Sequence, residues 1–243
     1  AKGAVLGNRD NFSKMRVTNG KNFSYPGYNE MLVGYPDDRV DRNDLGPNPN
    51  VTVFEWLNRQ KGMRGRVVAV GAWETFTDIF NSRRSKLPMF AGKVEPLDAR
   101  AHAAAMRFLK EKHPRALFVA YVETDDFAHR GDYGKTLAAA NRVDAYVAEL
   151  WAAVQSDGRY RNRTTLIFTA DHGRGRGADW TDHGPDIAGA DEIWAAIVGP
   201  HVNAMGDVRG GFFTESQIAA TVAATLGLDY QRAATGAAPA IRR

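Results

Sequence analysis

The sequence predicts a single α/β domain with a mostly parallel sheet, and three observations support this class. The chain has 243 residues, which is the size of one ordinary domain with enough core to fold unaided. Hydrophobic residues make up 44% of the chain and charged residues 25%, as in globular proteins. After the first fifty residues, short apolar runs alternate with segments of helical periodicity, the pattern of repeated α/β units.

The expected elements follow from the period and length of each apolar pattern. Short runs rich in β-branched residues predict buried strands, and longer segments with a 3.6-residue period predict helices. In chain order the predictions are strand 67–70, helix 98–112, strand 116–122, helix 133–154, strands 164–169 and 192–198, and helix 215–226. Gly227 ends the last helix. Two irregular stretches, residues 34–50 and 173–191, are long enough to indicate functional loops.

Composition limits the bonds, metal ligands and partners that the chain can have. Cysteine is absent, so disulfides and thiolate metal ligands are excluded and any metal must bind to His, carboxylate or hydroxyl groups. The net charge of +4 would help to attract anionic substrates. The basic residues are scattered along the chain, and no nucleic-acid recognition motif stands out among them. The sequence contains neither a transmembrane stretch nor a signal peptide. It opens without Met, which indicates a processed protein or a missing beginning.

Asp171 and His172 directly follow the predicted strand 164–169. Ligands of open α/β sheets gather at the carboxyl ends of strands, and an Asp beside a His can hold a divalent metal ion. The alternative for this dipeptide alone is an Asp that caps a turn beside a solvated His.

Further Asp and His residues follow in two other loops. Asp125 and His129 come after strand 116–122, and their four-residue separation places both on one face of a helical turn. His183 lies in the irregular loop after residue 173. The remaining histidines are interpreted as structural or exposed; these are His102, His113 and His201.

Ser24 is the candidate nucleophile. It precedes Pro26 and a short apolar helix that ends at Gly34, so its hydroxyl lies in the field of a helix N-terminus, where backbone amides bind phosphate-like anions. The alternative is that Ser24 only caps this helix.

Four segments, in this order, resemble the alkaline phosphatase superfamily, and in particular its type I phosphodiesterase and nucleotide pyrophosphatase-like branch. They are SYPGYNEMLVGYP, ETDDFAH, TADHG and TDHG. The resemblance spans the chain from about Gly20 to the closing helix. It implies an α/β/α sandwich with two divalent metal ions, zinc or alternatively manganese, that flank a hydroxyl nucleophile.

The resemblance also implies a role for each motif residue. Ser24 takes the nucleophile position, where many relatives have Thr. One metal ion would be held by Asp125, His129 and His183. Asp171 and His172 would hold the other ion together with Ser24. Asn43 corresponds to the phosphate-binding asparagine that follows the nucleophile helix.

Two departures from the family pattern matter. The second metal of the family also needs an Asp at the end of a first strand, and Asp10 is not assigned to this role because no strand is recognisable before it. We therefore expect residues 1–243 to form one catalytic domain that lacks its first strand. Sulfatases carry an Arg where this chain has Tyr28, so formylglycine is not expected and Ser24 should act as an unmodified alcohol.

These features predict a metal-dependent hydrolase of phosphoric esters, a phosphodiesterase or phosphatase that forms a phosphoseryl intermediate on Ser24. One alternative is a phosphomutase of the same superfamily, although the segment between Gly34 and Asp125 is short for a cap domain. Another is a non-catalytic relative that binds phosphate or nucleotide. The expected partner is a small phosphorylated substrate, and the family's frequent export implies a periplasmic or secreted location. The leaving group and the oligomeric state stay open.

Overall fold

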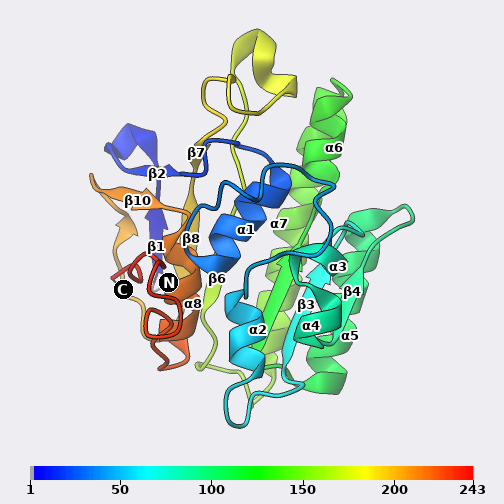
Figure 1. Cartoon of the computed structure of the whole chain (residues 1–243), viewed down its shortest axis with the longest axis vertical. Helices are drawn as coiled ribbons and strands as arrows, with labels where there is room; N and C mark the ends of the chain where they lie inside the picture. The colour runs from blue at the N-terminus through cyan, green and yellow to red at the C-terminus, as the bar shows by residue number, and fades with distance from the viewer. Residues whose placement is uncertain (1–2, 243) are drawn as a thin grey trace. The chain divides into compact units, whose positions relative to one another are not determined.

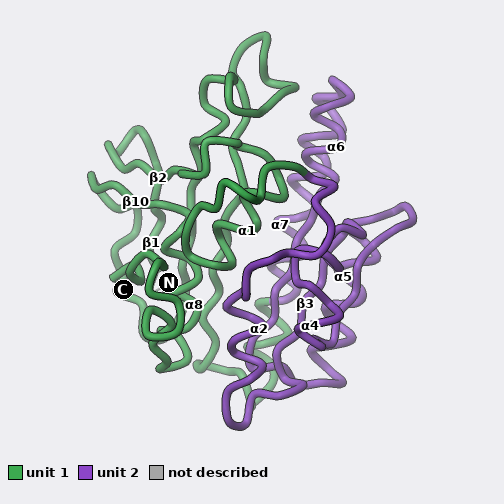
Figure 2. The backbone as a smooth tube through the Cα atoms, in the orientation of Figure 1, with its two compact units in different colours: residues 1–42, 151–243 green, residues 43–150 purple. Residues whose placement is uncertain are grey.

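The computed structural model describes residues 3–242 as two compact units, which Figure 2 distinguishes by colour. Of the described residues, unit 1 comprises 3–42 and 151–242, and unit 2 comprises 43–150. Each unit contains its own sheets and helices (Figure 1). The boundary at residue 150 falls within the long helix α7 (Tyr133–Ser156). Among the described residues, no helix is both long and apolar enough to cross a membrane.

The larger sheet of unit 1 has the strand order β6-β8-β1-β9. Strand β8 (Ala195–Val198) runs antiparallel to both β6 (Leu166–Thr169) and β1 (Gly3–Leu6), and β1 is parallel to β9 (Gly206–Asp207). The expectation that no strand precedes Asp10 is therefore wrong, because β1 ends four residues before it. This strand is only four residues long, and although its residues alternate between half-buried and buried in the structure, all four are small or apolar, so the sequence has no alternation by which to recognise it.

The smaller sheet of unit 1 has the order β10-β2-β7. Strand β2 (Lys14–Arg16) is parallel to β10 (Phe212–Thr214) and antiparallel to β7 (Glu192–Ile193). The predicted strand 192–198 is thus divided between two sheets, β7 and β8, with Trp194 at the break. Two short 3-10 helices, η1 (Arg9–Asn11) and η2 (Gly177–Thr181), lie in loops of this unit.

Two helices pack together in unit 1, α1 (Ser24–Val33) and α8 (Gln217–Thr225). Every residue of α1 except Ser24 is buried, as expected of a helix that is covered on all sides. The helix ends at Gly34, whose left-handed φ of 87° suits glycine and whose N–H donates to the carbonyl of Glu30. Ser24 is therefore the accessible end of a buried helix.

Unit 2 contains a parallel sheet with the order β4-β3-β5, which confirms the expected α/β pattern for this part of the chain. Its strands are β4 (Met89–Ala91), β3 (Val67–Gly71) and β5 (Ala116–Ala120). Every residue of β3 is buried, because a central parallel strand is covered on both faces. The core of the unit packs Val68, Val70 and Ala72 against the small residues of one helix face, Ala101, Ala104 and Ala105.

The helices of unit 2 include the longest predicted ones. Helix α5 (Leu97–Lys112) contacts all three strands, and α2 (Val53–Asn58) contacts β3. The remaining helices are short: α3 (Phe76–Ile79), α4 (Ser82–Ser85) and α6 (Glu123–His129). The predicted bounds of α5, α7 and β3 agree with the observed ones within two residues, because their hydrophobic periods are long or unambiguous.

The buried carboxylate of Glu30 on α1 anchors the loop that leads into this helix. It accepts hydrogen bonds from the backbone N–H and hydroxyl of Thr18, from the backbone and side-chain N–H groups of Asn19, and from the hydroxyl of Ser216. These donors lie between 2.6 and 3.1 Å from the carboxylate oxygens. A fully buried carboxylate needs such donors to offset its lost hydration.

Glu215 is as fully buried as Glu30, but its carboxylate has different surroundings. Neither of its carboxylate oxygens has a hydrogen-bond donor. Burial away from water, together with the charges of Glu30 and Asp171, raises the pKa of the Glu215 carboxyl well above its usual range. The folded chain therefore binds a proton at Glu215 more tightly than the unfolded chain does.

This contrast predicts opposite effects for two matched substitutions. The pKa of Glu215 is higher in the folded chain than in the unfolded chain, so the protonated form of this residue favours folding. This contribution to the free energy of unfolding is fully present at low pH and is lost as the pH rises through the folded pKa. Glu215→Gln should raise the free energy of unfolding at pH 8 by about 1–3 kcal/mol and flatten its pH dependence. Glu30→Gln should lower it by a similar amount, about 1–3 kcal/mol, because the donors lose their anion. Urea unfolding at pH 5 and pH 8 measures both, and a destabilised Glu215→Gln at pH 8 would contradict this account.

Candidate metal centre

Ser24 and His172 meet in unit 1 although they are 148 residues apart in the chain. Ser24 is the first residue of α1, and His172 follows the carboxyl end of β6. The Ser24 Oγ lies 3.4 Å from the Nε2 of His172. The hydroxyl is thus placed at the N-terminus of a buried helix, whose amide dipoles favour anions, and beside an imidazole nitrogen.

The orientation of the His172 ring is determined by its other nitrogen. Nδ1 lies 2.9 Å from the carbonyl oxygen of Gly173, which can only accept, so Nδ1 carries the proton. Nε2 is therefore the lone-pair nitrogen. It faces Ser24 and also lies 3.6 Å from the Oδ2 of Asp171. A His whose far N–H is held by a backbone carbonyl is the arrangement typical of metal ligands.

His183 repeats this arrangement. Its Nδ1 donates to the carbonyl of Asn22 over 3.1 Å, so Nε2 is the nitrogen with which it can bind a metal. Its ring centre lies 4.1 Å from that of His172. The loop after residue 173 thereby brings a second imidazole to the one that faces Ser24.

The donor geometry distinguishes a metal site from a Ser-His-Asp triad. In such a triad the carboxylate binds the ring nitrogen opposite the one that faces the serine. Here Ser24 and Asp171 both face Nε2 of His172, and Nδ1 is occupied by Gly173. A hydroxyl oxygen and a carboxylate oxygen that both lie within 3.6 Å of an imidazole nitrogen with a lone pair suit a cation. Oxygen and nitrogen donors without thiolates fit zinc, or manganese in an oxygen-rich site.

Gly27, which the sequence analysis did not single out, allows α1 to approach Asp171. A Cβ on Gly27 would lie 2.1 Å from the carbonyl oxygen of Asp171 and 3.5 Å from its Cβ. No side chain fits at that distance from a backbone atom. The only sequence signal was a glycine one turn after the predicted nucleophile, inside a helix that would ordinarily avoid it.

Asp125 and His129 pair within unit 2. Both lie on α6, and the Nε2 of His129 is 3.2 Å from the Oδ2 of Asp125, as expected from their four-residue spacing. Both side chains are partly exposed. The structure therefore presents this carboxylate and this imidazole together, which the sequence predicted.

Two buried acids that the sequence analysis missed hold α6 in place. The carboxylate of Asp98 accepts from the N–H groups of Val122 and Glu123, at the start of α6. Glu123 in turn accepts from the N–H of Asp98 and pairs with Arg142 of α7. Burial raises the pKa of the Asp98 carboxyl to about 6, although these N–H donors oppose the shift. The reciprocal capping stabilises the N-termini of both α5 and α6.

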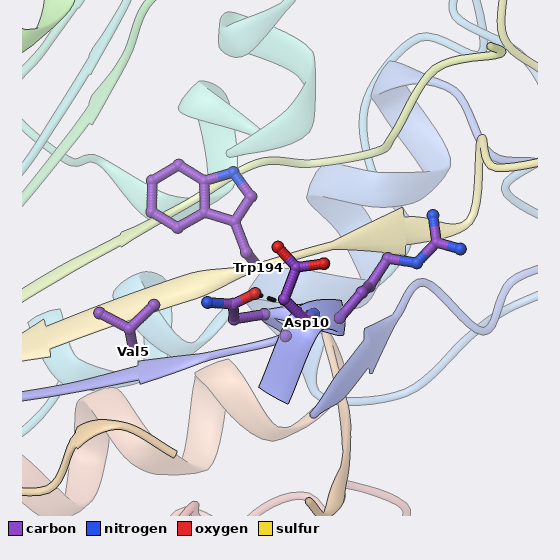
Figure 3. A pocket seen from close by; sticks show the side chains of 6 residues that line it. Val5, Asp10 and Trp194 are labelled. Carbon is purple, nitrogen blue, oxygen red and sulfur yellow. Dashed lines mark hydrogen bonds between the residues drawn. The ribbon is translucent and has the colours of Figure 1, made fainter. Parts of the chain in front are cut away.

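The other candidate residues have simpler surroundings. Asn43 is exposed in a turn of unit 2, and its phosphate-binding role stays a prediction. Asp10 is exposed in η1 and lines an open cavity of about 440 Å³ with Val5 and Trp194 (Figure 3).

The structural interpretation of the remaining histidines is confirmed. His102 is buried between the hydroxyl of Tyr121 and the carboxylate of Glu149. His113 ends α5 with a left-handed φ of 45°, and His201 is exposed.

A family model described as the metalloenzyme superfamily matches residues 47–230. No curated protein sequence matches the chain. Solved structures are similar in fold. Ps i-CgsB in complex with k-i-k-neocarrahexaose has a TM-score of 0.68 at 15% identity, and the match covers 98% of this chain and 67% of that one.

Two further solved structures extend the comparison. Murine ectonucleotide pyrophosphatase/phosphodiesterase 5 in complex with AMP has a TM-score of 0.66 at 12% identity, with 100% of this chain and 90% of that one covered. TAB5 alkaline phosphatase with bound Mg has a TM-score of 0.53 at 13% identity, with 94% and 89% covered. These similarities establish an alkaline phosphatase-like α/β fold.

A Gly→Ala substitution inside a helix usually stabilises the fold, but the close approach of α1 to Asp171 predicts that Gly27→Ala destabilises it. An alanine inside a helix is ordinarily up to about 1 kcal/mol more favourable than a glycine. At Gly27 the clash should instead lower the free energy of unfolding by about 2 kcal/mol and weaken zinc binding. Gly134→Ala in α7 is the matched control, since its Cβ would meet the nearest atom at 3.7 Å. Denaturant unfolding and zinc titration calorimetry compare the two, and equal behaviour would refute the packing argument.

Proposed function

The chain belongs to the metalloenzyme superfamily, and on this premise we propose that it is a metal-dependent hydrolase of phosphoric esters, a phosphodiesterase or phosphatase. One observation carries the proposal: the hydroxyl of Ser24 and the carboxylate of Asp171 converge on the lone-pair nitrogen of His172. A serine at the N-terminus of a buried helix beside metal-ligand side chains suits attack on an anionic phosphorus centre.

The ligand assignment follows from the motifs. We propose that Ser24, Asp171 and His172 hold one divalent ion, zinc or alternatively manganese. We propose that His183 belongs with Asp125 and His129 as a ligand of a second ion. A bound divalent ion favours the alkoxide form of a coordinated hydroxyl and neutralises charge on the phosphoryl oxygens.

The residues of this chain supply the nucleophile and its position. The Ser24 Oγ attacks the phosphorus atom, its proton passes to solvent, and the bond from phosphorus to the leaving-group oxygen breaks. The leaving alkoxide takes a proton from solvent. Water then attacks the phosphoseryl group and releases phosphate or a phosphomonoester, which restores the Ser24 hydroxyl. The amide dipoles of α1 stabilise the negative charge near Ser24 in both steps.

A small phosphorylated molecule is the proposed substrate. The fold is shared with a protein solved with AMP and with one solved with an oligosaccharide, which supports a small-molecule site of this general kind. We further propose an extracytoplasmic location, which the ectonucleotide phosphodiesterase among the structural neighbours supports.

The nucleophile assignment predicts the behaviour of Ser24→Ala. Turnover of p-nitrophenyl phosphate and of bis(p-nitrophenyl) phosphate should fall by about 10³-fold or more, because the variant lacks the hydroxyl that attacks phosphorus. Ser24→Ala should retain more bound zinc than His172→Ala, as measured by elemental analysis. Ser156→Ala, an exposed serine of α7, is the control and should leave turnover unchanged. Chelation should abolish activity and added zinc should restore it. Undiminished turnover by Ser24→Ala would exclude the covalent route.

A further inference from the structure

Two segments of unit 2 account for the net positive charge of the chain. Residues 59–66 and 107–115 hold eight of the 32 Lys and Arg residues but only one of the 28 Asp and Glu residues, Glu111. The rest of the chain therefore has 24 basic and 27 acidic residues, a net charge of −3 against +4 for the whole chain. The excess of positive charge is thus concentrated in these two segments.

Hydrogen bonds hold the two segments side by side at the amino ends of two parallel strands. The N–H of Arg115, just before β5, donates to the carbonyl of Arg66, just before β3, over 2.7 Å. The guanidinium of Arg66 donates to the carbonyl of His113 over 3.2 Å, although these residues are 47 positions apart. Both segments lie at the lower end of unit 2 in Figure 1, where α2 and α5 end. The fold therefore gathers their charges at one edge of the parallel sheet.

Most of these cations have no counter-ion. Arg59 pairs with Glu55, and Arg107 lies over the ring of Phe108. The other six are exposed, and none of them forms an ion pair with another described residue. These six residues are called the basic edge: Lys61, Arg64, Arg66, Lys110, Lys112 and Arg115.

Local stability explains only part of the basic edge. Lys110 and Lys112 lie in the last turn of α5, where cations interact favourably with the helix dipole. Lys61, Arg64 and Arg115 lie outside the helices, where no dipole compensates them. Like charges without counter-ions repel one another, and stable surfaces ordinarily mix charges of both signs. The concentration of unpaired cations therefore indicates an anionic partner.

The structure of the basic edge favours lipid headgroups over nucleic acid. Helix α5 presents its C-terminus here, whereas recognition helices contact bases with N-terminal residues. No large apolar or aromatic side chain of residues 59–66 and 107–115 is exposed, so a platform for stacked bases is absent from these described segments. Long, solvated cations at the edge of a sheet suit the diffuse negative charge of a bilayer surface.

Strand β5 separates the basic edge from two of the candidate metal ligands. The strand begins directly after Arg115 and ends at Ala120, and Asp125 and His129 follow on α6. Five residues of strand span about 16 Å. A surface bound at the basic edge would leave these ligand-type residues at the other end of the strand, open to small molecules from solution.

We propose that the basic edge docks the chain on an anionic lipid bilayer, with headgroup phosphates as the counter-ions of its six cations. The contact is electrostatic and stays at the membrane surface, because the basic edge has no exposed apolar side chain to insert. The proposal goes beyond the hydrolase function and does not depend on it.

Sedimentation with vesicles tests this docking. Vesicles of equal parts phosphatidylcholine and phosphatidylglycerol should bind the chain at least about 100-fold more tightly than vesicles of phosphatidylcholine alone. Binding should weaken as sodium chloride is added, because salt screens exposed charges. The double variant Lys61→Gln and Arg115→Gln removes one cation from each segment. It should bind the anionic vesicles about 20- to 30-fold more weakly than the unchanged chain.

The matched control is the double variant Lys14→Gln and Arg209→Gln, which removes one exposed Lys and one exposed Arg from unit 1. It should bind the anionic vesicles as the unchanged chain does. Both double variants should unfold at the same urea concentration as the unchanged chain, because none of the four cations has an ion pair among the described residues.

Three results would overturn the proposal. Equal binding to the two kinds of vesicle would show that anionic headgroups are not recognised. An equal loss of binding in the two double variants would show that net charge, and not the basic edge, decides binding. Tighter binding of a duplex DNA oligonucleotide than of anionic vesicles at the same salt concentration, lost in the basic-edge variant, would assign this surface to nucleic acid instead.

Discussion

The buried carboxylate of Glu30 is the interaction on which the candidate site of unit 1 depends. It gathers donors from Thr18, Asn19 and Ser216, so it joins α1 to the loop before it and to the start of α8. Asn19 then holds the backbone of Asn22, and Asn22 orients His183. An anion can be buried at this point because it has several donors, and those donors constrain the chain on both sides of Ser24.

Backbone carbonyls decide the chemistry of the two imidazoles. Gly173 and Asn22 each bind an Nδ1, so both rings have their Nε2 atoms as the nitrogens with lone pairs. The same side chains in the other tautomer would offer protons where a cation needs electron pairs. The capacity of these two imidazoles to accept a metal ion therefore depends on the loops that carry the carbonyls as much as on the histidines themselves.

Unit 2 anchors its pair of ligand-type residues by the same physical means. The reciprocal caps of Asp98 and Glu123, with Arg142 as counter-ion, hold the first turn of α6, and Asp125 and His129 follow on that helix. Glu215 shows what happens to a buried acid without donors: its pKa rises, and it destabilises the fold when it ionises. The difference between Glu30 and Glu215 lies in their donors, since both are fully buried.

The sequence by itself determined the elements whose period is long or whose composition is unambiguous, such as α5, α7 and β3. It also determined the pairing of Asp125 with His129. Residues within four positions of one another decide these features, so local sequence is enough to predict them. It also determined the motif order that led to the family. The tertiary structure decided what depends on contacts distant in the chain: the short strand β1, the break at Trp194, and the meeting of Ser24 with His172. Local periodicity carries no information about such contacts, because loop placement and hydrogen-bond partners are set by packing between segments more than a hundred residues apart.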